Sequence, residues 1–283
     1  MPTPTALTEF VTPDAVLQRL GIESFPAADF DGLRQLMLAY KLAVPFENLD
    51  PLSGKVVTSE LGAVANKIIG LQRGGWCFEM NQLFSEILRL TGFEVTLRLA
   101  RVSYRRPGPG PLTHTLMTVA LGEQTWLVDV GFGGPSAAEP LPWAAAEHVT
   151  EEGSHFRQHT LPNGDLEVLR QIEGAWERLY QVVPMAIQSI DLEMGSQFLS
   201  RWEPSPFRRM LMCVGFDGQH HWCSEGSSLV QRNLQWQEVS RQPLDSQDTL
   251  RAWLKSRLAL DVPEATLASA WSRWRDANPT ASP

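Results

Sequence analysis

The N-terminal third of the chain has apolar residues at helical spacing. Two helix faces can be traced between residues 14 and 44, one with Val16, Leu17 and Leu20 and the other with Leu33, Leu36, Met37 and Tyr40. Pro45 pushes the residue before it out of helical geometry, so a loop-rich stretch is expected to about Val56. A further helix is predicted over roughly residues 59–69. This third is therefore predicted to consist of short helices.

The segment Arg73-Gly-Gly-Trp-Cys77 leads into another helical pattern. Apolar residues recur at intervals of three and four from residue 83 to residue 90, and Gly92 supplies the usual stop. We expect a helix whose first residue is Cys77.

Beyond Gly92 the apolar period changes to two. Residues 95–99 alternate, further runs cover residues 116–121 and 126–130, and Asn163-Gly164 is a hairpin signal. The middle third is thus predicted to be antiparallel sheet. The last third is predicted to be a small mixed lid, with strands around residues 210–216 and 228–239 and helices near residues 248–258 and 263–275.

Composition narrows the class of protein. The 283 residues are 43% hydrophobic and 20% charged, which is ordinary globular usage and enough for two or three packed units. The formal net charge of -8 is spread over many short stretches, whereas a nucleic-acid partner would need clustered lysine and arginine. We therefore expect no nucleic-acid partner.

The cysteines and the N-terminal residues indicate the cellular compartment. The three cysteines, Cys77, Cys213 and Cys223, are an odd and sparse set that suits a reducing compartment better than a disulfide framework. The first residues lack a basic region followed by an apolar run, and no stretch of about 18 apolar residues occurs. We expect a cytoplasmic protein with no membrane partner.

Cys77 is the first candidate for chemistry. The two glycines before it allow the backbone to turn sharply into the predicted helix, so that the sulfur lies at the helix N-terminus. First-turn amides and the helix dipole stabilise a thiolate there, and a neighbouring imidazolium would add to the effect. The alternative is an inert buried thiol, as free cysteines often are. A histidine close to Cys77 would decide between the two.

His114 and Asp129 are the next candidates. His114 opens an apolar strand, and Asp129 lies near the end of the next strand. If the turn is centred between Gly122 and Glu123, the two side chains share a face and meet diagonally, with His114 opposite Gly131. A turn one residue longer or shorter would separate them, unless a bulge intervened.

Asp129 also lies inside the apolar run of residues 126–132, where a lone buried carboxylate would be costly. A capping or turn role is one explanation. A buried aspartate that fixes the tautomer of His114, while His114 activates Cys77, explains the position more economically. The three residue types then form a catalytic triad.

Four motifs, in order, resemble those of the bacterial-type arylamine N-acetyltransferase family. They span residues 44–134 and read Val44-Pro-Phe-Glu-Asn-Leu49, Arg73-Gly-Gly-Trp-Cys-Phe-Glu79, Thr113-His-Thr-Leu116 and Asp129-Val-Gly-Phe-Gly-Gly134. The chain length is similar to that of bacterial members, while the last third matches only loosely. One departure is Tyr40, where many relatives place a histidine.

The resemblance implies an α+β fold of the papain-like cysteine-enzyme superfamily. Its parts would be a helical bundle with the nucleophile (residues 1–92), an antiparallel β-barrel with histidine and aspartate (93–205) and an α/β lid (206–283). It implies ping-pong transfer of acetyl from acetyl-CoA, through a Cys77 thioester, to arylamines, hydrazines or arylhydroxylamines, as in xenobiotic metabolism. Acetyl-CoA or another short acyl-CoA would be a substrate, with no permanently bound cofactor, and the protein would be a monomer or homodimer.

The same resemblance suggests roles around the triad. Glu47 and Arg73 would pair as structural support, and Phe46 and Phe132 would line the arylamine pocket. A surface ion pair and two ordinary core phenylalanines are the alternatives. The loop of residues 105–110 would approach the CoA phosphates or be a plain exposed connection.

Other functions use some of the same residues. A transglutaminase or papain-like hydrolase needs the same triad, although the papain signature places its histidine much further from the cysteine. The same fold is expected for two further alternatives. One is an amide-forming acyltransferase of natural-product synthesis, and the other is a catalytically inactive binding module. A zinc site at Cys213, His220, His221 and Cys223 is disfavoured because the ligand spacing is wrong, so no metal is expected.

Overall fold

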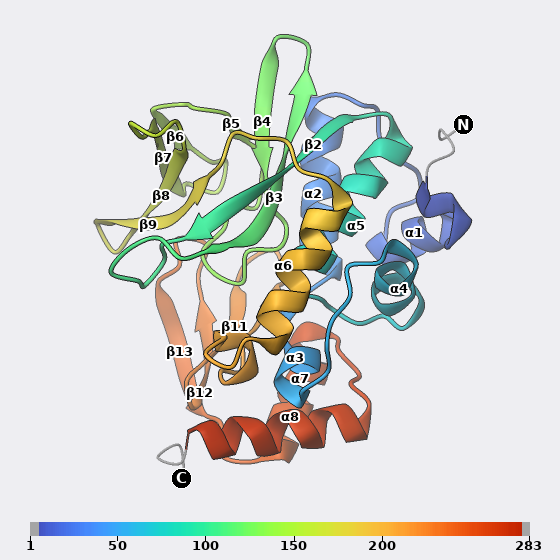
Figure 1. The fold of residues 1–283 in the computed structure, drawn as a ribbon, viewed down its shortest axis with the longest axis vertical. Coiled ribbons are helices and arrows are strands. Elements are labelled where there is room, and N and C mark those ends of the chain that lie inside the picture. Colours follow the sequence, from blue (N-terminus) through green and yellow to red (C-terminus); the bar gives the residue numbers. More distant parts are fainter. Residues whose placement is uncertain (1–5, 279–283) are drawn as a thin grey trace.

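The computed structural model describes residues 6–278 and has an α+β fold with two antiparallel sheets (Figure 1). The first third is helical, as predicted. Its elements are a 3-10 turn (Ala6–Glu9), α1 (Pro13–Leu20), α2 (Phe30–Ala43), α3 (Leu49–Ser53), α4 (Leu61–Ala65), a π-helical turn (Asn66–Gly70) and α5 (Cys77–Thr91). The stretch after Pro45 is less loop-like than expected, because it holds α3 and the two-residue strand β1 (Phe46–Glu47).

The middle of the chain forms an eight-stranded, nearly closed antiparallel sheet in the order β5-β4-β3-β2-β9-β8-β7-β6. Its strands are β2 (Glu94–Val102), β3 (Leu112–Leu121), β4 (Gln124–Val128), β5 (Leu141–Pro142), β6 (Glu147–Val149), β7 (His155–Thr160), β8 (Leu166–Ile172) and β9 (Ala175–Val182). Asn163 and Gly164 lie in the loop that joins β7 and β8, as their hairpin signal indicated.

The last third forms a five-stranded sheet with two helices. The sheet order is β1-β10-β11-β12-β13, from β10 (Cys213–Phe216), β11 (His221–Glu225), β12 (Ser228–Arg232) and β13 (Glu238–Pro243). The strand expected over residues 228–239 is in fact parts of two, because the chain turns between Arg232 and Glu238. Helices α7 (Gln247–Leu258) and α8 (Glu264–Ala277) follow, with α8 at the base of Figure 1.

The helical, barrel and lid regions share segments. Strand β1 pairs with β10, so Phe46 lies opposite Val214 and joins the lid sheet. Helix α6 (Ser189–Arg201), missed in the sequence, follows the barrel strands but contributes Leu192 and Leu199 to the core of the helical bundle. Figure 1 shows α6 running across the front of α5. The boundaries predicted after residues 92 and 205 remain predictions.

None of the helices within residues 6–278 has the length and apolar composition that a bilayer-spanning segment needs.

Candidate active site

Cys77 is the first residue of α5 and is 2% exposed. Neither Gly74 nor Gly75, which precede it, has a positive φ. These glycines are needed because other parts of the chain pack closely against their backbone. A Cβ on Gly74 would lie 2.2 Å from the carbonyl oxygen of Pro45. The amide of Glu47 donates to the carbonyl of Gly75 at 2.9 Å. The segment before the thiol is therefore pressed against β1, which fixes where the helix begins.

The β3–β4 hairpin brings His114 and Asp129 together. Leu121 pairs with Gln124, so the turn is the two residues Gly122 and Glu123, which confirms the predicted register. His114 Nε2 lies 2.7 Å from Asp129 Oδ2, and both side chains are buried. The diagonal pairing inferred from the sequence is present.

His114 also reaches the thiol. Burial by itself lowers the pKa of His114, but the charge of Asp129, its hydrogen bond and the contact with Cys77 outweigh burial and raise that pKa to about 10. The Cys77 sulfur lies 3.7 Å from the carbonyl oxygen of Thr113, the residue before His114. At neutral pH the structure thus holds an imidazolium between a carboxylate and the sulfur.

Asn81 completes this arrangement and was assigned no role from the sequence. Its Nδ2 donates to Asp129 Oδ1 at 3.1 Å and to the Thr115 carbonyl at 2.7 Å, while its Oδ1 accepts the Val130 amide at 3.1 Å. The available signal was its spacing of four from Cys77, which places both residues on one face of α5.

Two aromatic rings enclose the imidazole. Phe132 and Tyr180 each have their ring centroid 5.3 Å from that of His114. Burial and the nearby Asp129 carboxylate raise the pKa of Tyr180 well above its ordinary value, so its hydroxyl stays protonated. Tyr180 comes from β9, and nothing in the local sequence marked it.

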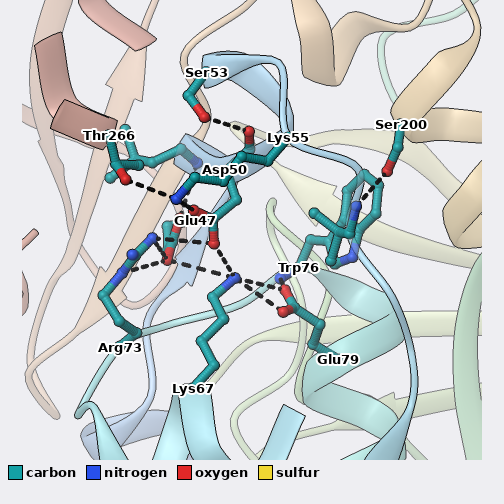
Figure 2. Close-up of polar contacts among 12 residues, drawn as sticks. Glu47, Asp50, Ser53, Lys55, Lys67, Arg73, Trp76, Glu79, Ser200 and Thr266 are labelled. Atoms are coloured by element: carbon teal, nitrogen blue, oxygen red, sulfur yellow. Dashed lines mark hydrogen bonds and ion pairs between the residues drawn. The ribbon is translucent and has the colours of Figure 1, made fainter. Parts of the chain in front are cut away.

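A buried charge network lies behind the start of α5 (Figure 2). Arg73 donates to Glu47 Oε1 through Nε at 3.0 Å and through a terminal nitrogen at 2.6 Å. Glu47 and Arg73 are 1% and 5% exposed, so the alternative of a surface ion pair is wrong. Their expected role as structural support remains a proposal.

Lys67 occupies the centre of this network, as Figure 2 shows. Its ammonium lies 2.9 Å from both carboxylate oxygens of Glu79 and 2.9 Å from Asp50. Glu79 Oε2 in turn accepts the backbone amide of Trp76 at 3.1 Å, directly before Cys77. Lys67 and Asp50 carried no signal in the sequence, because the network joins separate segments of the chain.

The members of this network have pKa values shifted in different directions. Burial raises the pKa of Glu79 more than Lys67 lowers it, so the net shift is upward. For Asp50 the cations outweigh burial and its pKa falls well below the usual range. For Lys67, attraction by Glu79 and the other carboxylates outweighs the lowering effect of burial, so its pKa is raised. Lys67 is therefore a permanent charge at neutral pH.

Two members of the candidate triad line a cavity of about 360 Å³, which is in the ordinary range for a small-molecule site. Cys77 and His114 lie in its wall, together with Phe46 and Phe132. Arg105 and Arg106 line it from the loop between β2 and β3. The structure thus brings both predicted pocket phenylalanines and part of the predicted phosphate loop to the cavity that holds the thiol.

The Cys/His residues of the lid are placed differently. Cys213 and Cys223 are buried free thiols, and burial raises the pKa of each. His221 stacks on Phe216 with ring centroids 4.7 Å apart. Within residues 6–278, no group of three or more histidine, cysteine, aspartate or glutamate side chains is arranged to hold a metal ion.

Comparison with known proteins places this geometry in a family. The family model described as N-acetyltransferase matches residues 29–267. The chain belongs to this family. It is 32% identical to the arylamine N-acetyltransferase of Escherichia coli over 230 residues, which cover 76% of this chain and 80% of that protein. It is 35% identical to the Mycolicibacterium smegmatis enzyme over 199 residues, 68% of this chain and 71% of that protein.

Solved structures give the same assignment. The arylamine N-acetyltransferase of M. smegmatis superposes with a TM-score of 0.86 at 26% identity, over 93% of this chain and 99% of that one. The Mycobacterium marinum enzyme in complex with CoA superposes with a TM-score of 0.83 at 25% identity, over 96% of this chain and 100% of that one. The expected α+β architecture of the family is confirmed.

Proposed function

We propose that this chain is an arylamine N-acetyltransferase that works by a ping-pong mechanism through an acetyl thioester on Cys77. The observation that carries the proposal is the contact of a helix-terminal thiol with an imidazole that is itself 2.7 Å from a buried carboxylate. Nucleophile, proton carrier and orienting carboxylate are the parts that covalent acyl transfer needs. Membership of the family and the named relatives support acetyl-CoA as the donor.

In the first half-reaction the Cys77 thiolate attacks the carbonyl carbon of acetyl-CoA. The carbon–sulfur bond to CoA breaks, the acetyl group remains on Cys77, and the imidazolium of His114 gives its proton to the departing CoA thiolate. Exchange of one thioester for another is close to balanced, so the step needs no further energy source. Asp129 holds the imidazole in place and stabilises its charged form.

In the second half-reaction an arylamine, hydrazine or arylhydroxylamine attacks the acetyl carbon. The neutral imidazole of His114 takes the proton from the attacking group, the bond to sulfur breaks, and the Cys77 thiolate returns. The backbone amide of Cys77, at the positive end of α5, would be a donor to the oxyanion of each tetrahedral intermediate. Phe46 and Phe132 would hold the aromatic ring beside the thioester.

The donor would lie along the same cavity. Arg105 and Arg106 are both exposed and line the cavity, where their guanidinium groups would meet the phosphates of CoA, although Arg105 already lies 3.8 Å from the Glu225 carboxylate. We expect Arg106→Ala to raise the KM for acetyl-CoA, most strongly at low ionic strength, and to leave the rate at saturating donor nearly unchanged.

Intact mass measurement tests the proposal directly. After brief incubation with acetyl-CoA and no amine, the native protein should gain one acetyl group, and Cys77→Ala and Cys77→Ser should gain none. Cys213→Ala, which removes another buried thiol, is the matched control and should still be acetylated. A native protein that gains no acyl group from acetyl-CoA or other short acyl-CoA donors would overturn the proposal.

A further inference from the structure

Helix α6 carries a row of exposed apolar side chains. The row, called here the α6 ridge, follows the helix at intervals of four residues and consists of Ile190, Met194, Phe198 and Trp202. The exposed fractions of these side chains run from 70% for Ile190 to 37% for Trp202. Figure 1 shows α6 at the surface of the molecule, in front of α5. A continuous apolar ridge is thus presented to solvent.

The opposite face of α6 is already packed against the helical bundle. Leu192 and Leu199 belong to the bundle core. A Cβ on Gly195 would lie 2.5 Å from the ring of Phe78, so the two helices are in close contact there. A helix that is apolar on both faces is normally buried on both, and a contiguous exposed apolar surface usually marks an interaction site. Residues 6–278 leave the α6 ridge uncovered.

The spacing of the ridge is complementary to a second copy of itself. If two α6 helices cross antiparallel with a twofold axis beside Ser196, each position meets the position equally far on the other side of Ser196 in the other copy. Ile190 then packs on Trp202. Met194 packs on Phe198 in the same way, and the twofold axis makes each contact twice. Packing of rows spaced by four residues is the commonest class of helix contact, so the crossing needs no unusual geometry.

The charges beside the ridge fit the same crossing. Asp191 and Arg201 are also equally far from Ser196, so the twofold axis brings each aspartate to the arginine of the other copy. Within one copy, Asp191 accepts the Gln188 amide at 2.8 Å, and Arg201 donates to Gln197 at 3.0 Å. Neither forms an ion pair with another of the described residues. Opposite charges at the rim of an interface fix its register and orientation.

A lipid surface fits this face less well. Helices that lie in a membrane interface are usually rich in lysine and arginine, which anionic lipids attract. Helix α6 has two acidic residues, Asp191 and Glu193, and a single basic one, Arg201, and the whole chain has a formal net charge of -8. The charges therefore favour a second copy of the chain over a membrane.

We propose that the protein forms a twofold-symmetric homodimer in which the α6 ridges of two copies pack antiparallel, with Met194 against Phe198. Helix α6 has 13 residues, a length of about 20 Å. Met185 and Met210, exposed in the segments before and after it, add apolar surface toward the area that a stable dimer needs. Trp202 also lines the cavity that holds the candidate nucleophile, so the interface would reach the wall of that cavity. The dimer does not depend on the proposed function.

Sedimentation velocity on the native protein tests the proposal. At about 10 μM and above, the mass should be twice the chain mass of 31.6 kDa. A mass of one chain at up to about 100 μM would overturn the proposal. Flotation with vesicles of phosphatidylcholine and phosphatidylglycerol is run in parallel. A monomer that binds these vesicles would assign the ridge to lipid instead.

Met194→Glu places a charge at the centre of the ridge in both copies and should raise the dissociation constant of the dimer about 100-fold or more. Met194 does not line the cavity that holds Cys77, so the variant should be acetylated at Cys77 to the same extent as the native protein. The matched control Val239→Glu introduces the same charge at another exposed apolar residue, on β13 at the edge of the lid sheet. It should leave the dimer intact. Dissociation by Val239→Glu and not by Met194→Glu would locate the contact at that sheet edge and overturn the proposal.

Exchange of the rim charges tests the register. Arg201→Glu and Asp191→Lys each create two pairs of like charges in the dimer, so each should raise the dissociation constant about 10-fold or more. The double variant with both changes should restore the native dissociation constant, because the pairs are again opposite in sign. Circular dichroism and the thermal midpoint, recorded for each variant, separate a loss of α6 from a loss of the interface. A folded double variant that stays as weakly associated as the single variants would overturn the proposal. If these variants do not fold, the native mass and Met194→Glu still decide.

Discussion

Nδ2 of Asn81 lies 3.1 Å from Oδ1 of Asp129, which joins the helix of the candidate nucleophile directly to the carboxylate of the barrel. The other oxygen of Asp129 faces His114 at 2.7 Å. The position of Asp129 is thus fixed by contacts from helix α5 and from strand β3. Because burial opposes its charge, the donors from His114, Asn81 and the Gly131 amide are what keep the pKa of Asp129 below its ordinary value.

Asn81→Ala should impair the acylation step beyond its effect on folding. The change removes a donor from Asp129 and leaves the Val130 amide and Thr115 carbonyl unpaired, so the free energy of unfolding should fall by roughly 2 to 4 kcal/mol. Acetylation of Cys77 at saturating acetyl-CoA should slow by about 10- to 100-fold in rapid-mix mass measurements. Gln82→Leu is the control on the same helix, since the Gln82 side-chain oxygen is buried with no hydrogen-bond partner among residues 6–278. Equal slowing in both variants would argue against a positioning role for Asn81.

Asp129→Asn should change the protonation state of His114. Its pKa of about 10 depends on the Asp129 charge, so a proton NMR titration of the variant should show a midpoint below 8, given the ordinary value of about 6.5. A histidine pKa raised on folding contributes stability that is fully present below the unfolded value and is lost as pH rises through about 10. The variant should lose that contribution, and kcat/KM should fall by about 10³- to 10⁴-fold. An unchanged titration would contradict the assigned pairing.

Lys67→Met should destabilise the start of α5. Removal of one partner from a buried ion pair costs about 3 to 5 kcal/mol. Without Lys67, Glu47 and Asp50 would keep Arg73, Asp50 would also keep the exposed Lys55, and Glu79 would have no ion pair among the described residues. In the variant, burial is no longer opposed by the Lys67 charge and raises the pKa of Glu79 further above its unfolded value, so the folded state binds more protons. The deficit relative to the native protein should therefore shrink as pH falls from 8 to 5 in urea unfolding experiments.

Lys55→Met is the control for this network. Lys55 pairs with Asp50 at 3.3 Å, but its side chain is 58% exposed. Screening by solvent limits such a pair to less than about 1 kcal/mol. A loss in Lys55→Met as large as that in Lys67→Met, or a Lys67→Met deficit that grows on acidification, would contradict the account of the network.

Gly131→Ala should abolish most activity because Gly131 packs against the candidate nucleophile. A Cβ there would lie 2.6 Å from the Asn81 Nδ2 and 2.9 Å from the Cys77 Cα. Displacement of about 1 Å at a catalytic group costs about 100-fold in rate, and kcat should fall by at least that much. Gly164→Ala is the control: its φ of +88° strains the substitution, yet a Cβ there would have no atom of the described residues within 4 Å. It should lower the thermal midpoint while kcat stays unchanged.

Much of the site could be predicted because it depends on local rules. The parity of the β3–β4 turn decided that His114 and Asp129 share a face, and the stop at Gly92 located the helix that begins at Cys77. The rule for the turn needs only a count of residues between two strands. The sequence was therefore sufficient to predict the contact between His114 and Asp129.

The missed features depend on contacts between distant segments. Lys67 lies at the centre of a network whose carboxylates come from β1, α3 and α5, and no periodic pattern relates their positions. Helix α6 alternates apolar with polar residues irregularly, and its exposed Ile190 and Met194 blur the amphipathic signal. Lys41 occurs next to Tyr40 on a buried face, yet a lysine in a helix is ordinarily expected in solvent.

Lys41 is buried, and its ammonium donates to the Ser136 hydroxyl at 2.6 Å but forms no ion pair with a carboxylate within residues 6–278, which should cost the folded protein stability. Burial lowers its pKa to about 8, opposed by Asp129 and Glu152 and aided by Arg170. A lysine pKa depressed on folding means that the unfolded state binds more protons between pH 8 and the unfolded value near 10.5, so native stability should rise with pH across that window. At pH 7 the shift corresponds to about 3 kcal/mol, less about 1 for the bond to Ser136.

Lys41→Met should therefore be more stable than the native protein by about 1 to 3 kcal/mol at pH 7, with the gain shrinking toward pH 10. Urea unfolding of the unacylated protein at several pH values measures this change in the free energy of unfolding. A variant that is less stable than the native protein at pH 7 would instead make Lys41 a structural residue whose bond to Ser136 holds α2 against the barrel.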